Sequence, residues 1–345
     1  MATPSKALAI DALIIGAGPI GLFQAFELGL LGVSAHIVDA LPEAGGQCIA
    51  LYADKPIYDI PGTKVCSGRE LVARLLDQVA PFKPKLHLRQ TVDSVVAQAD
   101  GRYRVQSSNG QEFITRSIFI AAGVGAFQAR KLHLAGLDAF EGTQVHYQVP
   151  ALADTQGKSV VIVGGEQAAL EAAADACDGP ARSVTLVHRR DVLHADAATL
   201  ARITTHRSSG RLRFIAGQAQ SFKGKARLHT LGILDADEQE IAVKLDQLWV
   251  FLGVSPKLGP VAQWGLDMER KQLLVDTATF ATSAPGIFAV GDINHYPGKK
   301  KLIVCGFHEA TLAAFGAMPF IRPGQAVALQ YTTTSTQLHK ALGVA

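Results

Sequence analysis

Cysteine is scarce in this chain: Cys48, Cys66, Cys177 and Cys305 are the four among 345 residues. They stand too far apart for a C-x-x-C pair or a zinc knuckle, so the sequence offers neither a redox disulfide motif nor a metal site. A chain of this length can bury a core without disulfide staples, and isolated thiols favour a reducing compartment. We therefore expect a cytoplasmic protein that binds no metal.

Excess charge and long apolar runs are also missing. The formal net charge is only +3, and no Lys/Arg stripe alternates with aromatic residues, so we expect no nucleic-acid partner. Residues 1–6 contain no apolar signal core, and Gln24 and Glu27 interrupt the longest apolar span. These features argue against export and membrane insertion. Apolar residues at 48% and charged residues at 18% are typical of a folded α/β protein.

Glycine, in contrast, is abundant, and two glycine turns share one plan. Each follows an apolar strand, at 12–15 and at 160–163, and precedes a helix of small residues. Such a turn lets the backbone approach a pyrophosphate, and the N-terminus of the helix supplies free N–H groups. The predicted contacts are Gly16, Gly18, Pro19 and Gly21 in the first turn and Gly164, Gly165 and Ala169 in the second.

The residue that ends the second strand differs between the two units. In the first unit this strand ends in Asp39, whereas in the second unit it ends in His188, Arg189 and Arg190. An acidic group at this place accepts hydrogen bonds from a ribose 2′-hydroxyl, and arginine suits a 2′-phosphate. The pair therefore predicts one flavin site and one NADP site.

Glu166 conflicts with the second prediction because it stands where the middle glycine of the turn belongs. Its side chain would crowd a pyrophosphate, and its carboxylate would repel it. Arg189 and Arg190 argue for binding, since each can form charge-assisted bonds to a 2′-phosphate. We favour NADP binding over the alternative, a vestigial turn whose arginines face solvent.

The first part of the chain predicts two helices and an antiparallel meander. Residues 21–31 fit the first helix, and Ser67 opens a second, amphipathic one. Residues 42–63 are rich in Pro, Gly and Tyr, which indicates an irregular loop over a ligand. Two alternating runs within 102–115 flank a Ser-Asn-Gly turn, a hairpin signal, and 117–122 fits a separate buried strand.

A second β-α-β unit begins near Lys158, and an alternating stretch covers 212–250. Beyond it, an apolar strand ends in Gly291-Asp292, and a helix covers 306–318. The fold class is α/β, with two Rossmann-like (three-layer ββα) nucleotide-binding domains, one inserted into the other. The predicted boundaries are 1–127 and 253–345 for the FAD domain and 128–252 for the NADP domain.

The loop at 45–52 combines a tight backbone with chemistry suited to a flavin. The amide of Gln47 can contact a flavin edge, and Tyr52 could stack on the isoalloxazine, the alternative being an ordinary buried tyrosine in a covering loop. Cys48 lacks a nearby partner because position 53 is alanine. We therefore favour inert packing for this thiol over a redox role.

Three segments carry a family resemblance: GGQCIALYADKPIYDIPG at 45–62, AAGVGAFQAR at 121–130 and GDINHYPGKKKLIVCGFHEA at 291–310. They resemble the pyridine nucleotide-disulfide oxidoreductases and, within them, the thioredoxin-reductase-like ferredoxin-NADP reductases, over essentially the whole chain. Thioredoxin reductases place a C-x-x-C pair just before the second glycine turn. Residues 145–150 contain no cysteine here, which excludes disulfide relay chemistry at that site.

The resemblance implies contacts to FAD at seven positions, of which Asp292 also fits physically, since a carboxylate at a buried strand end can accept a bond from a ribityl hydroxyl. The seven are Asp39, Gln47, Tyr52, Val92, Phe127, Asp292 and Thr333. It further implies an aromatic residue of the C-terminal tail over the second flavin face, which Tyr331 matches. Relatives of this type form homodimers, so a homodimer is expected.

The implied reaction needs no catalytic side chain, because the flavin carries the chemistry. NADPH would pass a hydride to flavin N5, and single electrons would then reach ferredoxin or flavodoxin. Lys299, Lys300 and Lys301 are a candidate docking patch for an acidic carrier, or else a solvated loop. Two alternatives stay open: an FAD-containing sensor or binding protein with NADPH turnover weakened by Glu166, and a reductase of a disulfide partner through Cys48.

Overall fold

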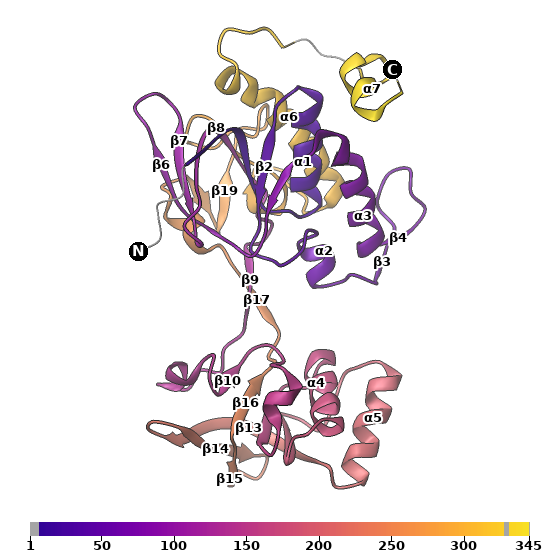
Figure 1. The fold of residues 1–345 in the computed structure, drawn as a ribbon, viewed down its shortest axis with the longest axis vertical. Coiled ribbons are helices and arrows are strands. Elements are labelled where there is room, and N and C mark those ends of the chain that lie inside the picture. The colour runs from indigo at the N-terminus through magenta and orange to yellow at the C-terminus, as the bar shows by residue number, and fades with distance from the viewer. Residues whose placement is uncertain (1–6, 328–330, 345) are drawn as a thin grey trace. The chain divides into compact units, whose positions relative to one another are not determined.

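The computed structural model describes residues 7–327 and 331–344, and the chain divides into two compact units (Figure 1). The first unit runs to Ala126 and resumes at Pro256, and the second unit is Phe127–Ser255. The chain passes between them through β9 (Ala126–Ala129) and β17 (Val254–Lys257), which pair with each other. An inserted unit in an α/β chain agrees with the predicted fold class. The structure divides the chain between residues 126 and 127 and between 255 and 256, whereas the sequence predicted boundaries at 127/128 and 252/253.

The first unit is built on a seven-stranded sheet in the order β5-β2-β1-β8-β7-β6, with β20 also paired to β8. Its parallel strands are β1 (Leu8–Ile15), β2 (Ala35–Val38), β5 (Lys85–His87), β8 (Glu112–Ile120) and β20 (Ile287–Ala289). The second half of β1, Ala-Leu-Ile-Ile, is buried throughout, as a strand covered on both faces must be.

Three helices bury their apolar faces in one core of this unit: α1 (Pro19–Leu30), α3 (Gly68–Val79) and α6 (Ile303–Ile321). The helix α1 begins two residues before the predicted start because Pro19 at its first position has the backbone angle that a helix needs. At the start of α3, Ser67 and Glu70 form a capping box.

The helix α6 is longer than the predicted 306–318 because it begins three residues earlier and continues through Pro319. Its length and composition would allow it to cross a membrane, a test that the core helix of a soluble protein also passes. Its small residues Ala313, Ala314 and Ala317 are fully buried in the core that it shares with α1.

The predicted meander is confirmed: β6 (Val92–Ala97), β7 (Tyr103–Ser107) and β8 pair in antiparallel fashion. The prediction of separate strands at 112–115 and 117–122 is wrong, because β8 runs unbroken from Glu112 to Ile120. One end of β8 pairs with β7 and the other end with β20, while β1 pairs along nearly all of it. Because β8 pairs with neighbouring strands on both sides of Arg116, it continues through this exposed residue.

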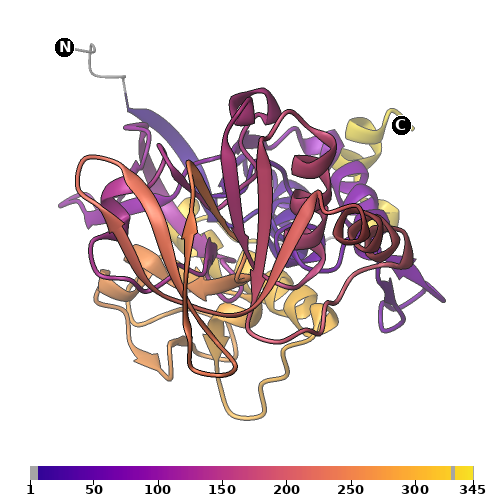
Figure 2. The same ribbon diagram turned by 90° about the horizontal axis from the view of Figure 1, so that it is seen from below.

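The second unit has its own seven-stranded sheet in the order β10-β16-β11-β12-β13-β14-β15, seen from below in Figure 2. The parallel strands are β10 (Val145–His146), β16 (Gln247–Val250), β11 (Ser159–Val163), β12 (Ser183–His188) and β13 (Leu212–Gly224); β14 (Leu228–Asp235) and β15 (Glu240–Lys244) are antiparallel. The helices α4 (Gln167–Asp178) and α5 (Ala197–Ser208) lie on the same side of this sheet (Figure 1).

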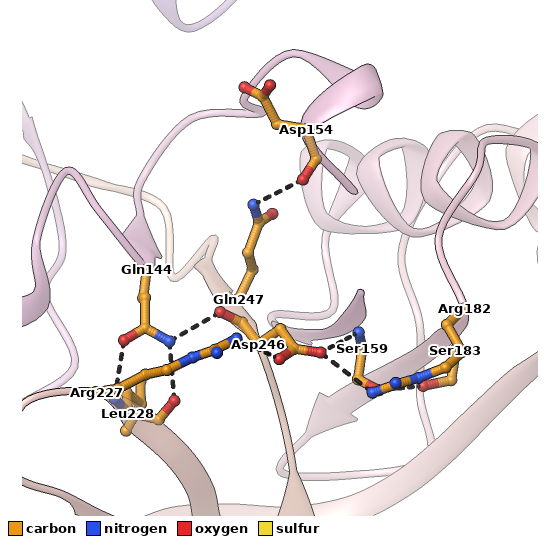
Figure 3. Close-up of polar contacts among 9 residues, drawn as sticks. All are labelled: Gln144, Asp154, Ser159, Arg182, Ser183, Arg227, Leu228, Asp246 and Gln247. Atoms are coloured by element: carbon orange, nitrogen blue, oxygen red, sulfur yellow. Dashed lines mark hydrogen bonds and ion pairs between the residues drawn. The ribbon is translucent and has the colours of Figure 1, made fainter. Parts of the chain in front are cut away.

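Asp246 connects several segments at the amino ends of the parallel strands (Figure 3). Its carboxylate accepts hydrogen bonds from Ser159 N at 2.9 Å, Arg182 Nη2 at 3.2 Å and Arg227 Nη2 at 2.6 Å. Gln144 adds a bond of 3.0 Å from its amide to the Asp246 carbonyl. Because Ser159 begins β11 and the glycine turn follows its end, this network is scaffolding on the edge opposite the turn.

The remaining short elements join or cover these sheets. They are α2 (Gln47–Ala50), β3 (Pro56–Ile57), β4 (Cys66–Ser67), β18 (Met268–Glu269), β19 (Gln272–Leu274), β21 (Asn294–His295) and α7 (Thr336–Leu342), with single-turn helices η1 (Ala80–Phe82), η2 (Leu137–Phe140), η3 (Leu152–Thr155), η4 (Gly259–Gln263), η5 (Gly291–Ile293) and η6 (Thr332–Thr334).

Candidate functional site

The three glycines of the first turn meet different demands. Gly16 has a φ of +111°, and a Cβ added to it would lie 2.4 Å from the carbonyl oxygen of Ala121. A Cβ on Gly21 would lie 1.9 Å from the Gly16 oxygen. At Gly18 the nearest atom to an added Cβ, Gly46 Cα, is 3.9 Å away. Only Gly18 therefore faces space that a ligand can enter and that a Cβ would narrow.

Asp39 ties the end of β2 to this turn. Its Oδ2 accepts a hydrogen bond from Ala17 N at 2.6 Å, and its Oδ1 accepts one from Leu41 N at 2.7 Å. Burial raises the pKa of this carboxyl group, and the two backbone bonds oppose the rise. Each oxygen has a further lone pair, so the carboxylate can still accept a ribose hydroxyl.

Segments far apart in sequence meet beyond the turn. The amide Nε2 of Gln47 donates to Asp292 Oδ2 at 3.3 Å, and a Cβ on Gly123 would lie 3.0 Å from the same nitrogen. These residues converge because β2, β1, β8 and β20 are parallel neighbours in one sheet; Gln47 follows the end of β2, Gly123 that of β8 and Asp292 that of β20. The predicted irregular loop at 42–63 holds Gln47 on the short helix α2 and also contains β3.

Cys48 and Tyr52 are hydrogen-bonded to each other beside this cluster. The thiol of Cys48 donates to Tyr52 Oη at 3.5 Å and is only 1% exposed. Burial raises the pKa of both groups above their ordinary values. A buried thiol with a raised pKa is a poor nucleophile, and Cys48 is not in a disulfide. Tyr52 packs against the core and is partly accessible.

The structure does not bring every predicted flavin contact to this place. The side chain of Val92 is 4% exposed and belongs to the core under the meander, so it can offer a ligand its backbone only. The side chain of Phe127 lies outside the described residues.

Tyr331 and Thr333 lie at the other end of the first unit. Tyr331 lines a pocket of about 400 Å³ with Glu27 and Arg322, next to the C-terminal end of α1. The glycine turn is at the N-terminal end of that 12-residue helix, a distance of roughly 17 Å. The tail is attached there through Gln337, whose Nε2 donates to Gly29 O at 3.4 Å, and α7 lies far from α2 in Figure 1. Within one chain, neither residue joins the Gln47–Asp292 cluster.

The second turn repeats the backbone plan of the first. Gly164 has a φ of +155°, and its N–H donates to Val187 O at 3.0 Å, as that of Gly16 does to Val38 O at 2.8 Å. A Cβ on Gly165 would lie 2.6 Å from the ring of His188. Ala169 takes the place of Gly21 on the following helix, where its side chain is fully buried.

Glu166 takes the place of Gly18 and is exposed at the N-terminus of α4. Its backbone is extended, with φ −102° and ψ 173°, and its side chain forms no capping hydrogen bond. The segment around His194 lies against the turn, since His194 N donates to Gly165 O at 2.9 Å. The carboxylate therefore stands where the first turn leaves open space.

Two free cations flank this turn. Arg189 and Arg190 are exposed, and neither forms an ion pair with any residue that the structure describes. The nearby Arg207 is engaged, because it pairs with Asp191 at 3.3 Å and stacks on Phe214 at 4.5 Å. Burial, followed by the charge of Arg189, lowers the pKa of His188. The end of β12 is thus a positive region with donors available for an anion.

Comparison with known proteins identifies the family. Residues 11–311 match the model of the pyridine nucleotide-disulphide oxidoreductases. The chain belongs to this family. It is 56% identical over 338 residues to a ferredoxin–NADP reductase of Albidiferax ferrireducens, covering 97% of this chain and 96% of that protein. It is 54% identical over 354 residues to a ferredoxin–NADP reductase of Paracidovorax citrulli, covering 99% and 98%.

Solved structures of this fold agree with the architecture. A thioredoxin reductase of T. acidophilum matches with a TM-score of 0.55 at 20% identity, covering 90% of this chain and 97% of that one. A bacillithiol disulfide reductase of Staphylococcus aureus matches with a TM-score of 0.59 at 15% identity, covering 90% and 98%. At these identities the likeness establishes the fold alone.

In this member of the oxidoreductase family, the lysine run is not one exposed patch. Lys300 and Lys301 are exposed, but the side chain of Lys299 is 5% exposed and pairs with the fully buried Glu309. The docking prediction is therefore wrong for Lys299. The sequence analysis missed Glu309, although it lies on the same face of α6 as Ala313, and a carboxylate on a buried face requires a cation nearby.

Proposed function

We propose that this protein is a flavoprotein oxidoreductase that transfers electrons between NADPH and ferredoxin, a ferredoxin–NADP reductase. The observation that carries the proposal is the pair of glycine turns that share a backbone plan but differ at the strand end, Asp39 in one and Arg189-Arg190 in the other. Relatives named ferredoxin–NADP reductase at 52–56% identity support it. When bound, FAD supplies the hydride acceptor and the single-electron donor that side chains cannot provide.

The residues of the first unit fit FAD. The N–H groups at the start of α1 face the open position at Gly18, where they can bind the pyrophosphate. Asp39 can accept the ribose hydroxyl next to the turn, and Asp292 can accept a ribityl hydroxyl while Gln47 fixes its carboxylate. Tyr52, which is partly accessible, offers an aromatic face to a flavin ring.

The residues of the second unit fit NADPH less completely. Arg189 and Arg190 can bind a 2′-phosphate with charge-assisted hydrogen bonds, which would favour NADPH over NADH. Glu166 opposes the pyrophosphate, because an exposed carboxylate stands at the helix N-terminus that should receive it. We therefore infer that the arginines determine cofactor choice and that Glu166 weakens the overall affinity.

The chain supplies positioning rather than acid-base catalysis. Cys48 is buried and hydrogen-bonded to Tyr52, so it does not serve as a nucleophile in this proposal. Ferredoxin is the electron carrier in the names of the relatives. We propose flavodoxin as a second carrier, because flavodoxins, like ferredoxins, are usually acidic proteins. We further propose that the protein works as a homodimer in the cytoplasm.

The exposed Glu166 favours one alternative, an FAD-containing sensor or binding protein with weak NADPH turnover. Anaerobic mixing of the purified yellow protein with NADPH separates the two. Rapid loss of the oxidised-flavin absorption band at about 450 nm, followed by its return when oxidised ferredoxin is added, supports the reductase. A band that persists in NADPH supports the sensor.

A further inference from the structure

The first unit contains an ion pair that the proposed reaction does not use. Glu309 is fully buried in α6, and the side chain of Lys299, in the loop before that helix, is 5% exposed. Besides Lys299, the carboxylate accepts hydrogen bonds from Gly291 N at 2.7 Å, Asn294 Nδ2 at 2.8 Å and Tyr296 Oη at 3.0 Å. Every donor comes from the segment 291–299, so the carboxylate organises this segment alone.

The pair holds Gly291 from both sides. The N–H of Gly291 donates to Glu309 Oε2, and its carbonyl accepts a hydrogen bond from Lys299 Nζ at 2.9 Å. Gly291 has a φ of +79°, a left-handed conformation that two independent bonds at its own N–H and C=O stabilise. The direction in which the chain leaves Gly291 is thereby fixed.

The next residue is Asp292, the carboxylate in contact with Gln47. Its carbonyl is held as well, by Gln272 Nε2 at 3.1 Å. Asn294 completes the turn, with Nδ2 donating to Ala289 O at 2.8 Å. All the anchors act on the backbone or on neighbouring residues and leave one Asp292 oxygen, Oδ1, without a partner among the described residues.

A buried ion pair contributes little net stability, because desolvation offsets the attraction between the charges, and apolar residues of similar volume often serve as well. Apolar residues could not bind the polar atoms that the pair binds. Here the Glu309 carboxylate accepts the N–H of Gly291 and the Lys299 ammonium group donates to its C=O, and such charge-assisted hydrogen bonds are stronger than neutral ones. The function of the pair therefore lies in the geometry of the turn.

We propose that Lys299 and Glu309 are positioning residues that aim the Asp292 carboxylate at the ribityl chain of FAD. The inference rests on the proposed flavin site in the first unit. It does not depend on the electron donor or on the carrier. Lys299 supports the cofactor site through its hydrogen bond to Gly291 O. Its exposed neighbours Lys300 and Lys301 have no such role.

The test is a double-mutant cycle on FAD affinity, measured by titrating FAD into the full chain from which FAD has been removed. Lys299→Met is expected to weaken FAD binding about tenfold or more, since it leaves Gly291 O and Glu309 without their cation. Lys300→Met, the matched change at an exposed neighbour, is expected to leave the dissociation constant within about twofold. In an Asp292→Ala background, Lys299→Met should also change it by less than about twofold, because its effect passes through Asp292.

An equal effect of Lys299→Met with and without Asp292 would show a general loss of structure and overturn the proposal. Should Lys299→Met not fold because Glu309 is left unpaired, the double variant Lys299→Met/Glu309→Gln removes both charges and enters the same cycle. Failure of this neutral variant to fold would also overturn the proposal, since the pair would then be a folding element. A chain that binds FAD with the predicted coupling but does not reduce ferredoxin would contradict the proposed function alone.

Discussion

Gly18→Ala should separate cofactor binding from folding. The backbone at Gly18 has φ −70° and ψ 179°, which alanine adopts without strain, and the new Cβ would have its nearest neighbour at 3.9 Å. Removing a glycine from the unfolded chain stabilises a protein by about 0.4–1 kcal/mol where the conformation is compatible. The apoprotein should therefore be as stable as the original or slightly more stable.

The same methyl group points into the space where the pyrophosphate would approach the turn. If the phosphate has to move away from the N-terminus of α1, it loses hydrogen bonds to the backbone that are each worth about 1.5–3 kcal/mol. One such bond corresponds to a tenfold to hundredfold weaker FAD affinity, roughly. The expected phenotype is a folded protein that is purified largely without its yellow cofactor.

Two measurements on the same samples decide the matter: thermal unfolding of the FAD-free protein and titration with FAD. Gly21→Ala is the contrasting variant, because its Cβ would lie 1.9 Å from the Gly16 oxygen and must distort the turn. It should lower the stability of the FAD-free protein by about 2 kcal/mol or more. If Gly18→Ala bound FAD with unchanged affinity, the assignment of this turn to the pyrophosphate would be refuted.

Three further results are expected. Arg189→Ala should weaken NADPH binding about tenfold to hundredfold and NADH binding by less than threefold, roughly, because the lost bonds go to the 2′-phosphate; equal losses in a fluorescence titration would contradict this role. Lys300→Ala/Lys301→Ala should slow the reduction of ferredoxin and flatten its dependence on salt in stopped-flow measurements, and an unchanged rate and slope would mean that the two lysines face solvent only. The stacked pair His36–His87, with ring nitrogens 2.9 Å apart, has lowered pKa values, chiefly through burial. The contribution of the neutral pair to stability is therefore complete above the unfolded-state pKa of about 6.5 and is lost as the pH falls below it. The His36→Phe variant should show a smaller decline in melting temperature than the original protein between about pH 7 and pH 5. An equal decline in the two proteins would contradict the role of the pair.

Local pattern was sufficient to predict the two glycine turns and the strand ends beside them, because these residues lie close together in sequence. The first turn, its helix and Asp39 form one β-α-β unit, and the structure connects them through the bond from Ala17 N to Asp39 at 2.6 Å. The second turn follows the same rule, and its strand end carries the free Arg189 and Arg190. In both, the glycine spacing predicts a particular backbone path.

Contacts across long stretches of sequence required the fold. Gln47 and Asp292 are 245 residues apart and meet because the strands that precede them, β2 and β20, end at the same edge of one parallel sheet, with β1 and β8 between them. Composition gave no indication that Lys299, within a run of three lysines, is buried, since its partner lies on another element. Tyr331 was assigned from resemblance, and the position of the tail at the C-terminal end of α1 could not be predicted from a segment with so little pattern.

The most direct test of the account is to reduce the purified protein anaerobically with NADPH and mix it with oxidised ferredoxin in a stopped-flow instrument. The account predicts bleaching of the flavin by NADPH much faster than by NADH, then reoxidation of the flavin in step with reduction of ferredoxin, and no reduction of disulfide substrates. A protein that binds no flavin, or whose flavin is reduced by NADPH yet passes no electrons to ferredoxin, would contradict it.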